Sequence, residues 1–167
     1  DLDKLCAAIS ENTKLLMVVN ILGNPNNFSI INEILKDKKI IMIEDNCESL
    51  GAKFKDKFTG TFGIMGSYSS FFSHHISTME GGLITTDDIE LYHILLSIRS
   101  HGWTRNLPKE NKISSLKSDN EFEESFKFIL PGYNLRPLEI SAAVGLKQLI
   151  KLPNLIIERR KNSEFLK

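Results

Sequence analysis

Two apolar runs on either side of an amphipathic segment constrain the fold of this chain more than any other feature of its sequence. Residues 15–19 and 40–43 are apolar throughout and include β-branched side chains. An asparagine-rich turn at 23–27 precedes a segment whose apolar residues have helical spacing: Phe28, Ile31, Ile34 and Leu35. A strand, a helix and a second strand within about 30 residues predict a βαβ unit with a parallel sheet that is buried on both faces.

The segments around this unit are predicted to extend an α/β arrangement. Residues 2–12 have helical periodicity and precede the first strand, residues 53–58 alternate like an exposed hairpin, and residues 82–86 form another strand. Asp87 and Asp88 then cap a helix whose core face is predicted to be apolar: Leu91, Leu95, Leu96 and Ile98.

The second half of the chain is expected to contain a long loop and two helices. Residues 100–130 are mainly polar, and a loop of this length is usually functional or disordered, so we expect it to be partly mobile. Pro137 suits the first turn of a helix over residues 138–150, and Pro153 ends or restarts that helix before a charged helix at 154–167. The chain opens on an aspartate in what reads as a helix in mid-domain, so we expect a piece of a longer protein.

Composition and charge exclude several classes of function. Lysine plus arginine and aspartate plus glutamate both number 21, so the excess of positive charge that non-specific nucleic-acid binding needs is missing. No apolar run approaches the length of a membrane span, and the first residues lack the layout of a signal peptide. We therefore expect a cytoplasmic protein with no nucleic-acid or membrane partner, in which Cys6 and Cys47 are free thiols.

Carboxylates follow the second apolar run directly. In open α/β sheets ligands bind at the carboxyl ends of the strands, which is where the sequence places Asp45. A carboxylate there stays ionised if it pairs with a cation, for example a protonated heteroaromatic nitrogen. The alternative is that Asp45 only caps a short helix beginning near Cys47.

A pair of histidines, His74 and His75, is predicted to lie in a loop that closes on a Glu-Gly-Gly turn. A metal site is disfavoured because no cysteine or third histidine lies at ligand spacing. A general acid or base suits His74 better, since the unperturbed pKa of histidine lies near neutrality. The alternative is a hydrogen-bonded structural imidazole, which is the role that we expect for His93 on its helix.

Serines and arginines offer anion-binding groups, each with an ordinary structural alternative. Hydroxyls beside Gly66 can bind phosphate together with free backbone N–H groups, or they can simply belong to a serine-rich strand edge: Ser69, Ser70 and Ser73. Three arginines can hold carboxylate or phosphate groups, or can serve as surface ion-pair partners: Arg99, Arg105 and Arg136.

Taken together, the chain resembles the sugar aminotransferase family, whose members use pyridoxal phosphate on an aspartate-aminotransferase-like fold. The resemblance rests on five segments: 44–52, 60–70, 80–82, 99–102 and 133–136. In most of that family a lysine six residues before the glutamate of the Glu-Gly-Gly turn binds the cofactor covalently. Here that position is His74, which narrows the resemblance to the family's 3-dehydratase branch. A related CDP-sugar branch holds an iron–sulfur cluster through cysteines, but residues 103–109 contain none.

The resemblance implies a three-layer α/β/α fold of the pyridoxal-phosphate-dependent transferase type, fold type I, incomplete at both ends. Residues 1–150 are then part of the cofactor-binding large domain, and residues 151–167 begin the helix that leads toward a small domain. Asp45 is expected to pair with the pyridine nitrogen, Ser69 to hold the cofactor phosphate, and Glu48 to lie near the ring. His74 is implied as the catalytic acid and base.

A homodimer with shared active sites is also implied, in which Asn134 reaches the phosphate of the neighbouring subunit's cofactor. Three further residues are implied in substrate binding: Arg105, Phe126 and Arg136. The implied reaction removes the C3 hydroxyl of a nucleotide-linked 4-keto-6-deoxy sugar, GDP-4-keto-6-deoxymannose, in colitose-type deoxysugar and O-antigen biosynthesis. Pyridoxal phosphate or pyridoxamine phosphate is the expected cofactor and glutamate the amino donor. The alternatives are a nucleotide-sugar aminotransferase and a non-catalytic fragment of such an enzyme.

Overall fold

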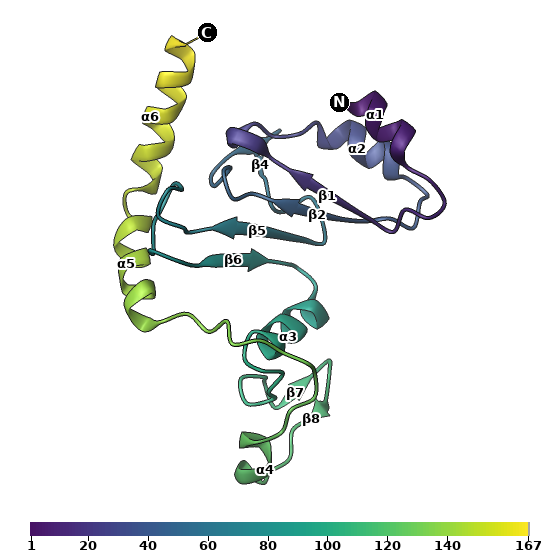
Figure 1. Ribbon diagram of the computed structural model, residues 1–167, viewed down its shortest axis with the longest axis vertical. Coiled ribbons are helices and arrows are strands. Elements are labelled where there is room, and N and C mark those ends of the chain that lie inside the picture. Colours follow the sequence, from purple (N-terminus) through teal and green to yellow (C-terminus); the bar gives the residue numbers. More distant parts are fainter. Residues whose placement is uncertain (167) are drawn as a thin grey trace. The chain divides into compact units, whose positions relative to one another are not determined.

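The computed structural model describes residues 1–166 and divides into two compact units (Figure 1). Unit 1 combines Asp1–Thr85 with the helical segment that begins at Glu139. Unit 2 comprises Thr86–Leu138.

The centre of unit 1 is a four-stranded sheet in the order β1-β2-β5-β6. Strands β1 (Leu15–Val19), β2 (Ile41–Asp45) and β5 (Met65–Ser69) are parallel, and β6 (Gly82–Thr85) is antiparallel to β5. The predicted βαβ unit and the α/β class are therefore confirmed, although β2 begins one residue later than expected and includes its acidic end. Because β1, β2 and β5 are parallel, their carboxyl ends meet at one edge of the sheet.

Two helices pack on one face of this sheet, α1 (Leu2–Ala8) and α2 (Phe28–Leu35). Asn27 caps α2 as predicted, because its Oδ1 accepts a hydrogen bond from the backbone N–H of Ile30 at 3.2 Å. The first helix is four residues shorter than predicted and ends at Ala8. The core beneath the helices consists of four buried residues: Val18, Phe28, Ile31 and Met42.

The prediction that the strands are buried on both faces is wrong for the described residues. Val18 and Met42 point toward the helices and are buried, but Leu15 and Met17 are 51% and 52% exposed. Successive side chains of a strand point to opposite faces, so only alternate residues reach the helical layer. A continuous apolar run predicts burial on both faces, but here the second face of β1 and β2 is open.

The connections around the sheet agree with the predicted turns. A 3-10 turn, η1 (Ile21–Gly23), follows β1, and the hairpin of β3 (Lys53–Phe54) and β4 (Lys57–Phe58) is present as expected. Phe54 of this hairpin packs on the core beneath α2.

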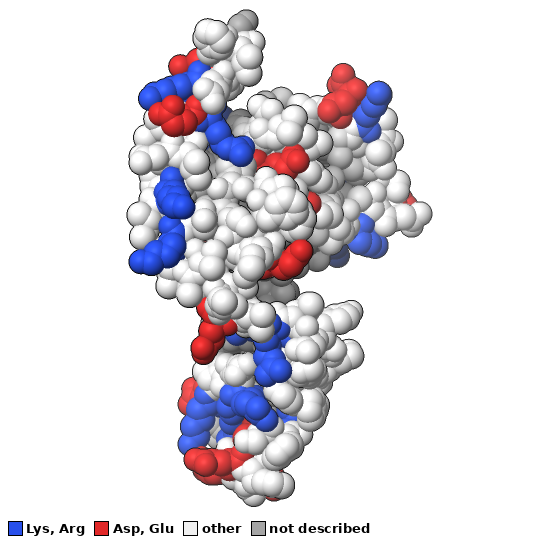
Figure 2. Space-filling view, turned by 60° about the vertical axis from the view of Figure 1, so that its left-hand side comes forward, with Lys and Arg blue, Asp and Glu red and all other residues white. Residues whose placement is uncertain are grey.

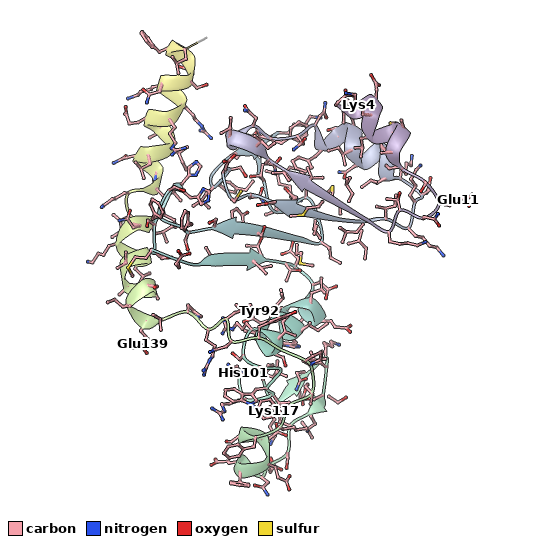
Figure 3. The ribbon with its side chains drawn as sticks, in the orientation of Figure 1. Lys4, Glu11, Tyr92, His101, Lys117 and Glu139 are labelled. Carbon is pink, nitrogen blue, oxygen red and sulfur yellow. The ribbon has the colours of Figure 1, made fainter. Side chains whose placement is uncertain are left out.

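Unit 1 ends in two helices, α5 (Glu139–Leu149) and α6 (Leu152–Phe165), and Figure 3 labels Glu139 at the start of α5. Pro153 lies in the first turn of α6, which confirms the predicted restart. No single described helix is long and apolar enough to cross a membrane, although the bent pair of α5 and α6, with 55° between them, meets the length and composition criteria together.

Unit 2 begins with the predicted helix, α3 (Ile89–Ile98), and three short elements then interrupt the predicted long loop: β7 (Glu110–Asn111), β8 (Ser115–Leu116) and α4 (Glu121–Ser125). Asp88 caps α3 as predicted. The most buried side chains of α3 are His93 and Ser97, whereas the predicted apolar core face is only half-buried.

The core of unit 2 is largely polar, which explains why no periodic pattern revealed it. The buried Thr104 hydroxyl donates to Glu124 Oε2 at 2.7 Å, and the Ser118 N–H donates to Oε1 at 2.8 Å. Lys127 Nζ also lies 3.3 Å from Glu124 Oε1. The hydrogen bonds, together with this ion pair, hold the pKa of Glu124 below its ordinary value. His93 Nδ1 accepts the Lys112 N–H at 3.1 Å, so the predicted structural role of His93 is confirmed.

Candidate functional site

The carboxyl ends of β2 and β5 place polar side chains on the open face of the sheet. Asp45 is in register with Ser67 on the neighbouring parallel strand. Because side chains alternate along a strand, Ser67 and Ser69 lie on the same face as Asp45, and Glu44 lies on the opposite face. The structure therefore brings two of the predicted cofactor-binding residues, Asp45 and Ser69, to one face of adjacent strands.

Asp45 closes a turn and does not cap a helix. Its Oδ1 accepts the backbone N–H of Cys47 at 3.0 Å, and residues 46–51 form turns, so the short helix expected near Cys47 is absent. The carboxylate is half-buried. Burial and the adjacent Asp45 raise the pKa of the Cys47 thiol, which stays protonated at neutral pH. A backbone donor thus fixes the position of the Asp45 side chain.

Glu44, the residue before Asp45, is a buried structural anchor that the sequence pattern did not predict. It is 2% exposed, and its two oxygens accept backbone N–H groups from Gly60 at 2.6 Å, Phe62 at 2.6 Å and Gly63 at 2.9 Å. The Asn20 amide adds a fourth donor at 3.3 Å. Glu44 therefore anchors the 60–63 loop against the end of β2. Strand alternation was the available signal, since Glu44 shares the inward face with Met42.

The loop after β5 carries both histidines and is tied at its ends. The backbone N–H of Ser70 donates to the Gly81 carbonyl at 3.0 Å, and the Thr78 N–H donates to the Ser70 carbonyl at 2.8 Å. The hydroxyls of Ser70 and Thr78 lie 2.6 Å apart. Residues 70–81, here called the histidine loop, are thus a closed segment that leaves β5 and returns to β6.

His74 lies in the middle of the histidine loop and is half-buried. Its backbone N–H donates to the Phe71 carbonyl at 3.0 Å, and its ring meets the Phe71 ring edge-on at a centroid distance of 6.1 Å. Among residues 1–166, no group of three or more histidine, cysteine, aspartate or glutamate side chains is placed to hold a metal ion.

His75 contacts the helical segment of unit 1. Its Nε2 lies 3.3 Å from Nη1 of Arg159 in α6. A guanidinium only donates hydrogen bonds, so Nε2 accepts and the imidazole is neutral in this contact. Burial, followed by the charge of Arg159 and the neighbouring His74, lowers the pKa of His75. The two histidines therefore have different surroundings, and the partner found for His75 is a cation.

Glu48 and Ser69 are also held by backbone groups. Glu48 Oε2 accepts the Leu22 N–H at 2.9 Å, and Ser69 Oγ accepts the Phe71 N–H at 3.2 Å. The Ser69 hydroxyl keeps its own proton to donate. This places a hydrogen-bond donor at the end of β5, where an anionic group is expected.

The remaining predicted residues lie in unit 2. Arg105 stacks on the ring of Trp103 at 4.1 Å, and its Nη2 donates to the Ser125 carbonyl at 2.6 Å. Arg136 lies 5.4 Å from the same ring. These stacking contacts replace the surface ion pairs that were the alternative for both arginines. Phe126 is 61% exposed. The backbone of Asn134 forms an isolated antiparallel β-bridge with Ser100.

An open groove of about 450 Å³ lies beside Arg105 in unit 2. Its lining mixes basic, acidic and hydroxyl side chains: Arg105, Lys109, Lys117, Ser118, Asp119, Glu121, Glu124 and Ser125. Figure 2 shows blue and red side chains interspersed over the drawn face of the molecule, and Figure 3 labels Lys117 and His101 within unit 2.

The donor set of unit 1 fits pyridoxal phosphate or pyridoxamine phosphate held without a covalent bond. Asp45 offers a carboxylate for a protonated ring nitrogen, and Ser69 offers a hydroxyl for a phosphate, both on the open face of the sheet. The histidine loop contains no lysine that can bind the aldehyde. In this part of the chain, a cofactor at the carboxyl edge of the sheet is therefore held by polar contacts and not by a covalent bond to lysine.

Comparison with known proteins gives one family. The model of the DegT/DnrJ/EryC1/StrS aminotransferase family matches residues 1–167. Among curated proteins, GDP-4-keto-6-deoxy-D-mannose 3-dehydratase of Escherichia coli O55:H7 is 62% identical over 165 residues, which is 99% of this chain and 42% of that protein. The chain thus spans about two fifths of the length of this relative.

Solved structures give the same result. A mutant of GDP-4-keto-6-deoxymannose-3-dehydratase with bound GDP-perosamine has a TM-score of 0.96 and 62% identity to this chain. The match covers 99% of this chain and 43% of the chain of that enzyme. The same enzyme with a trapped PLP-glutamate geminal diamine has the same TM-score, identity and coverage.

Proposed function

The chain belongs to the DegT/DnrJ/EryC1/StrS aminotransferase family, and we propose that the whole protein is a pyridoxal-phosphate-dependent 3-dehydratase. The proposed substrate is a GDP-linked 4-keto-6-deoxy sugar, GDP-4-keto-6-deoxymannose, which is supported by the name of the 62% identical relative. The observation that carries the proposal is His74, which stands in a loop without lysine directly after the strand that ends at Ser69.

Three residues of unit 1 are proposed to hold the cofactor. Asp45 pairs with the ring nitrogen and keeps it protonated, because an ionised carboxylate favours the charged form of a basic partner. Ser69 donates its hydroxyl to the phosphate, and Glu48 lies near the ring. The relative with a bound PLP-glutamate adduct supports this choice of cofactor.

His74 is proposed to move the proton that the reaction requires. When bound in its amine form, the cofactor supplies an amine for the C4 ketone of the sugar and an electron sink that acidifies the neighbouring C–H bond. An imidazole nitrogen of His74 removes that proton as a general base. The imidazolium then donates a proton to the C3 hydroxyl as it leaves, so one residue serves as base and acid.

Glutamate closes the electron balance of the proposed reaction. Replacing the C3 hydroxyl by hydrogen and releasing water reduces the sugar by two electrons. Oxidation of glutamate to 2-oxoglutarate and ammonia consumes that water and supplies both electrons. The net change is therefore hydroxy sugar plus glutamate to deoxy sugar, 2-oxoglutarate and ammonia.

We also propose that the whole protein is a cytoplasmic homodimer with shared active sites. Asn134 of the partner subunit then reaches the cofactor phosphate, while Arg105, Phe126 and Arg136 line the substrate pocket. Large exposed apolar side chains in unit 2 support an interface there: Phe122, Phe126, Tyr133 and Leu135. The two free cysteines suit a reducing compartment.

Replacing His74 by asparagine in the whole protein tests its proposed role. The variant is expected to lose deoxygenation by roughly 10²–10⁴-fold, the range for a general acid–base residue, while it keeps cofactor binding, which is measured by cofactor absorbance. His75→Asn is the matched comparison and is expected to lose far less of the deoxygenation activity. Turnover of His74→Asn close to that of the unmodified protein would rule out His74 as the base.

Chemical trapping separates the dehydratase from an ordinary aminotransferase. The whole protein is treated with borohydride in the presence of pyridoxal phosphate and digested. No lysine peptide is expected to carry the reduced cofactor, because the position that the lysine holds in aminotransferases is His74. A stoichiometric lysine adduct supports the aminotransferase alternative.

A further inference from the structure

The helical segment of unit 1 makes four contacts with the site segments, although it lies far from them in sequence. The less exposed residues of α5 recur at helical spacing and define one inward face: Ser141, Val144, Gly145 and Gln148. The face continues into α6, where Ile156 packs on Gly51 and Arg160 Nη2 donates to the Gly51 carbonyl at 3.5 Å. Arg159 contacts His75 of the histidine loop.

Gly145 of α5 faces Thr78 of the histidine loop. A Cβ atom at this position would lie 2.9 Å from Cγ2 of Thr78, closer than the ordinary contact distance. Glycine weakens a helix interior relative to alanine, so its presence in the middle of α5 needs a reason. The methyl group of Thr78 supplies that reason, because it occupies the space that a side chain at 145 would take.

Thr78 cannot move aside without breaking the closure of the loop. Its Oγ1 lies 2.6 Å from Ser70 Oγ, 2.9 Å from the Glu80 carbonyl oxygen and 3.3 Å from the Ser70 carbonyl oxygen. Its single side-chain torsion places both the hydroxyl and the methyl group, so a rotation that frees the methyl group removes the hydroxyl from Ser70. Thr78 therefore transmits the position of α5 to the base of the loop.

We propose that Gly145 is a positioning residue for His74, acting through the methyl group of Thr78 and the closure of the histidine loop. The role of His74 rests on the proposed function, but the contact between Gly145 and Thr78 does not. Arg159 supports the same arrangement from α6 by its contact with His75. The inward face of α5 and α6 thus sets where the catalytic histidine stands.

The test uses five variants of the whole protein: Gly145→Ala, Thr78→Ser, the double variant of these two, Thr78→Val and Lys147→Ala. Serine at 78 keeps the hydroxyl and removes the methyl group, which opens room for the new Cβ. Lys147 is exposed on the outer side of α5 and serves as the control. Hydrogen–deuterium exchange of the 70–81 amides without substrate is measured together with turnover.

Gly145→Ala is expected to speed exchange in residues 70–81 and to lower kcat roughly tenfold or more, because small displacements of a catalytic group are costly, with cofactor absorbance retained. The double variant is expected to restore most of the protection from exchange and most of kcat. Lys147→Ala is expected to change neither the exchange rate nor kcat. Thr78→Val, which keeps the methyl contact and removes the hydroxyl, is expected to speed exchange as well.

Unchanged exchange in Gly145→Ala, or a double variant that recovers nothing, overturns the proposal. If the unmodified protein performs no deoxygenation, the proposed function fails, and the exchange data alone then decide on the contact between Gly145 and Thr78.

Discussion

At the scale of single residues, two adjacent carboxylates at the end of β2 have different surroundings. Glu44 points into unit 1 and is held by three backbone N–H groups and the Asn20 amide, whereas Asp45 lies on the open face with one backbone donor. The alternation of the strand produces this division. Glu44 therefore fixes the loop that follows the hairpin, and Asp45 remains available for a cationic partner.

Replacing Glu44 by glutamine is expected to destabilise the protein. The amide NH₂ of glutamine would face backbone donors that now reach a carboxylate oxygen, so at least one buried N–H loses its acceptor. The expected decrease in the free energy of unfolding is about 2–4 kcal/mol, measured by denaturant unfolding.

Glu33→Gln is the matched control for this substitution. Glu33 is an exposed residue of α2 that pairs with Lys36 at 3.8 Å, and its replacement is expected to change the free energy of unfolding by less than about 1 kcal/mol. Equal effects of the two substitutions would show that Glu44 is not a buried anchor.

The burial of His75 and its contact with Arg159 predict a dependence of stability on pH. The pKa of His75 is lowered in the folded protein, so the unfolded chain binds more protons as the pH falls below about 6.5, the ordinary value for histidine. The stabilisation is therefore complete above that pH and is lost progressively below it.

The free energy of unfolding, measured between pH 8 and pH 5, is expected to fall more steeply for the unmodified protein than for His75→Gln, which cannot take up the proton. Identical slopes would contradict the lowered pKa of His75.

At the scale of elements, capping and alternation explain what the sequence could predict. The parallel strands, the hairpin, the asparagine cap of α2 and the aspartate cap of α3 all followed from local patterns. The part of unit 2 that follows α3 did not, because its order depends on polar contacts between distant residues, such as Thr104 with Glu124. Such contacts leave no periodic signal in the sequence.

The cap of α2 offers a test at this scale. Asn27→Ala removes the oxygen that accepts the Ile30 N–H and is expected to cost about 1 kcal/mol of stability, measured by denaturant unfolding. Asn12→Ala, at an exposed turn position, is the control and is expected to change stability by less than half as much. A cost for Asn27→Ala no larger than that of the control would show that the cap is not stabilising.

At the scale of the whole molecule, the sequence predicted the family, which the family model confirms, and the structure added the framework around the residues that are proposed to hold the cofactor. Asp45 and Ser69 were expected together and lie on one face of adjacent strands. The roles of Thr78, Gly145 and Arg159 depend on contacts between α5, α6 and the histidine loop, which no local pattern encodes. The domain division at residue 150 and the shared active sites remain predictions.

Product analysis of the whole protein tests the central proposal most directly. The protein is incubated with GDP-4-keto-6-deoxymannose, pyridoxal phosphate and glutamate, and the nucleotide sugar is identified by mass spectrometry and NMR. The proposal predicts a GDP-sugar that has lost the C3 oxygen and kept the C4 ketone, with 2-oxoglutarate and ammonia formed in equal amounts. A product that retains the C3 hydroxyl and carries an amine at C4 would contradict it.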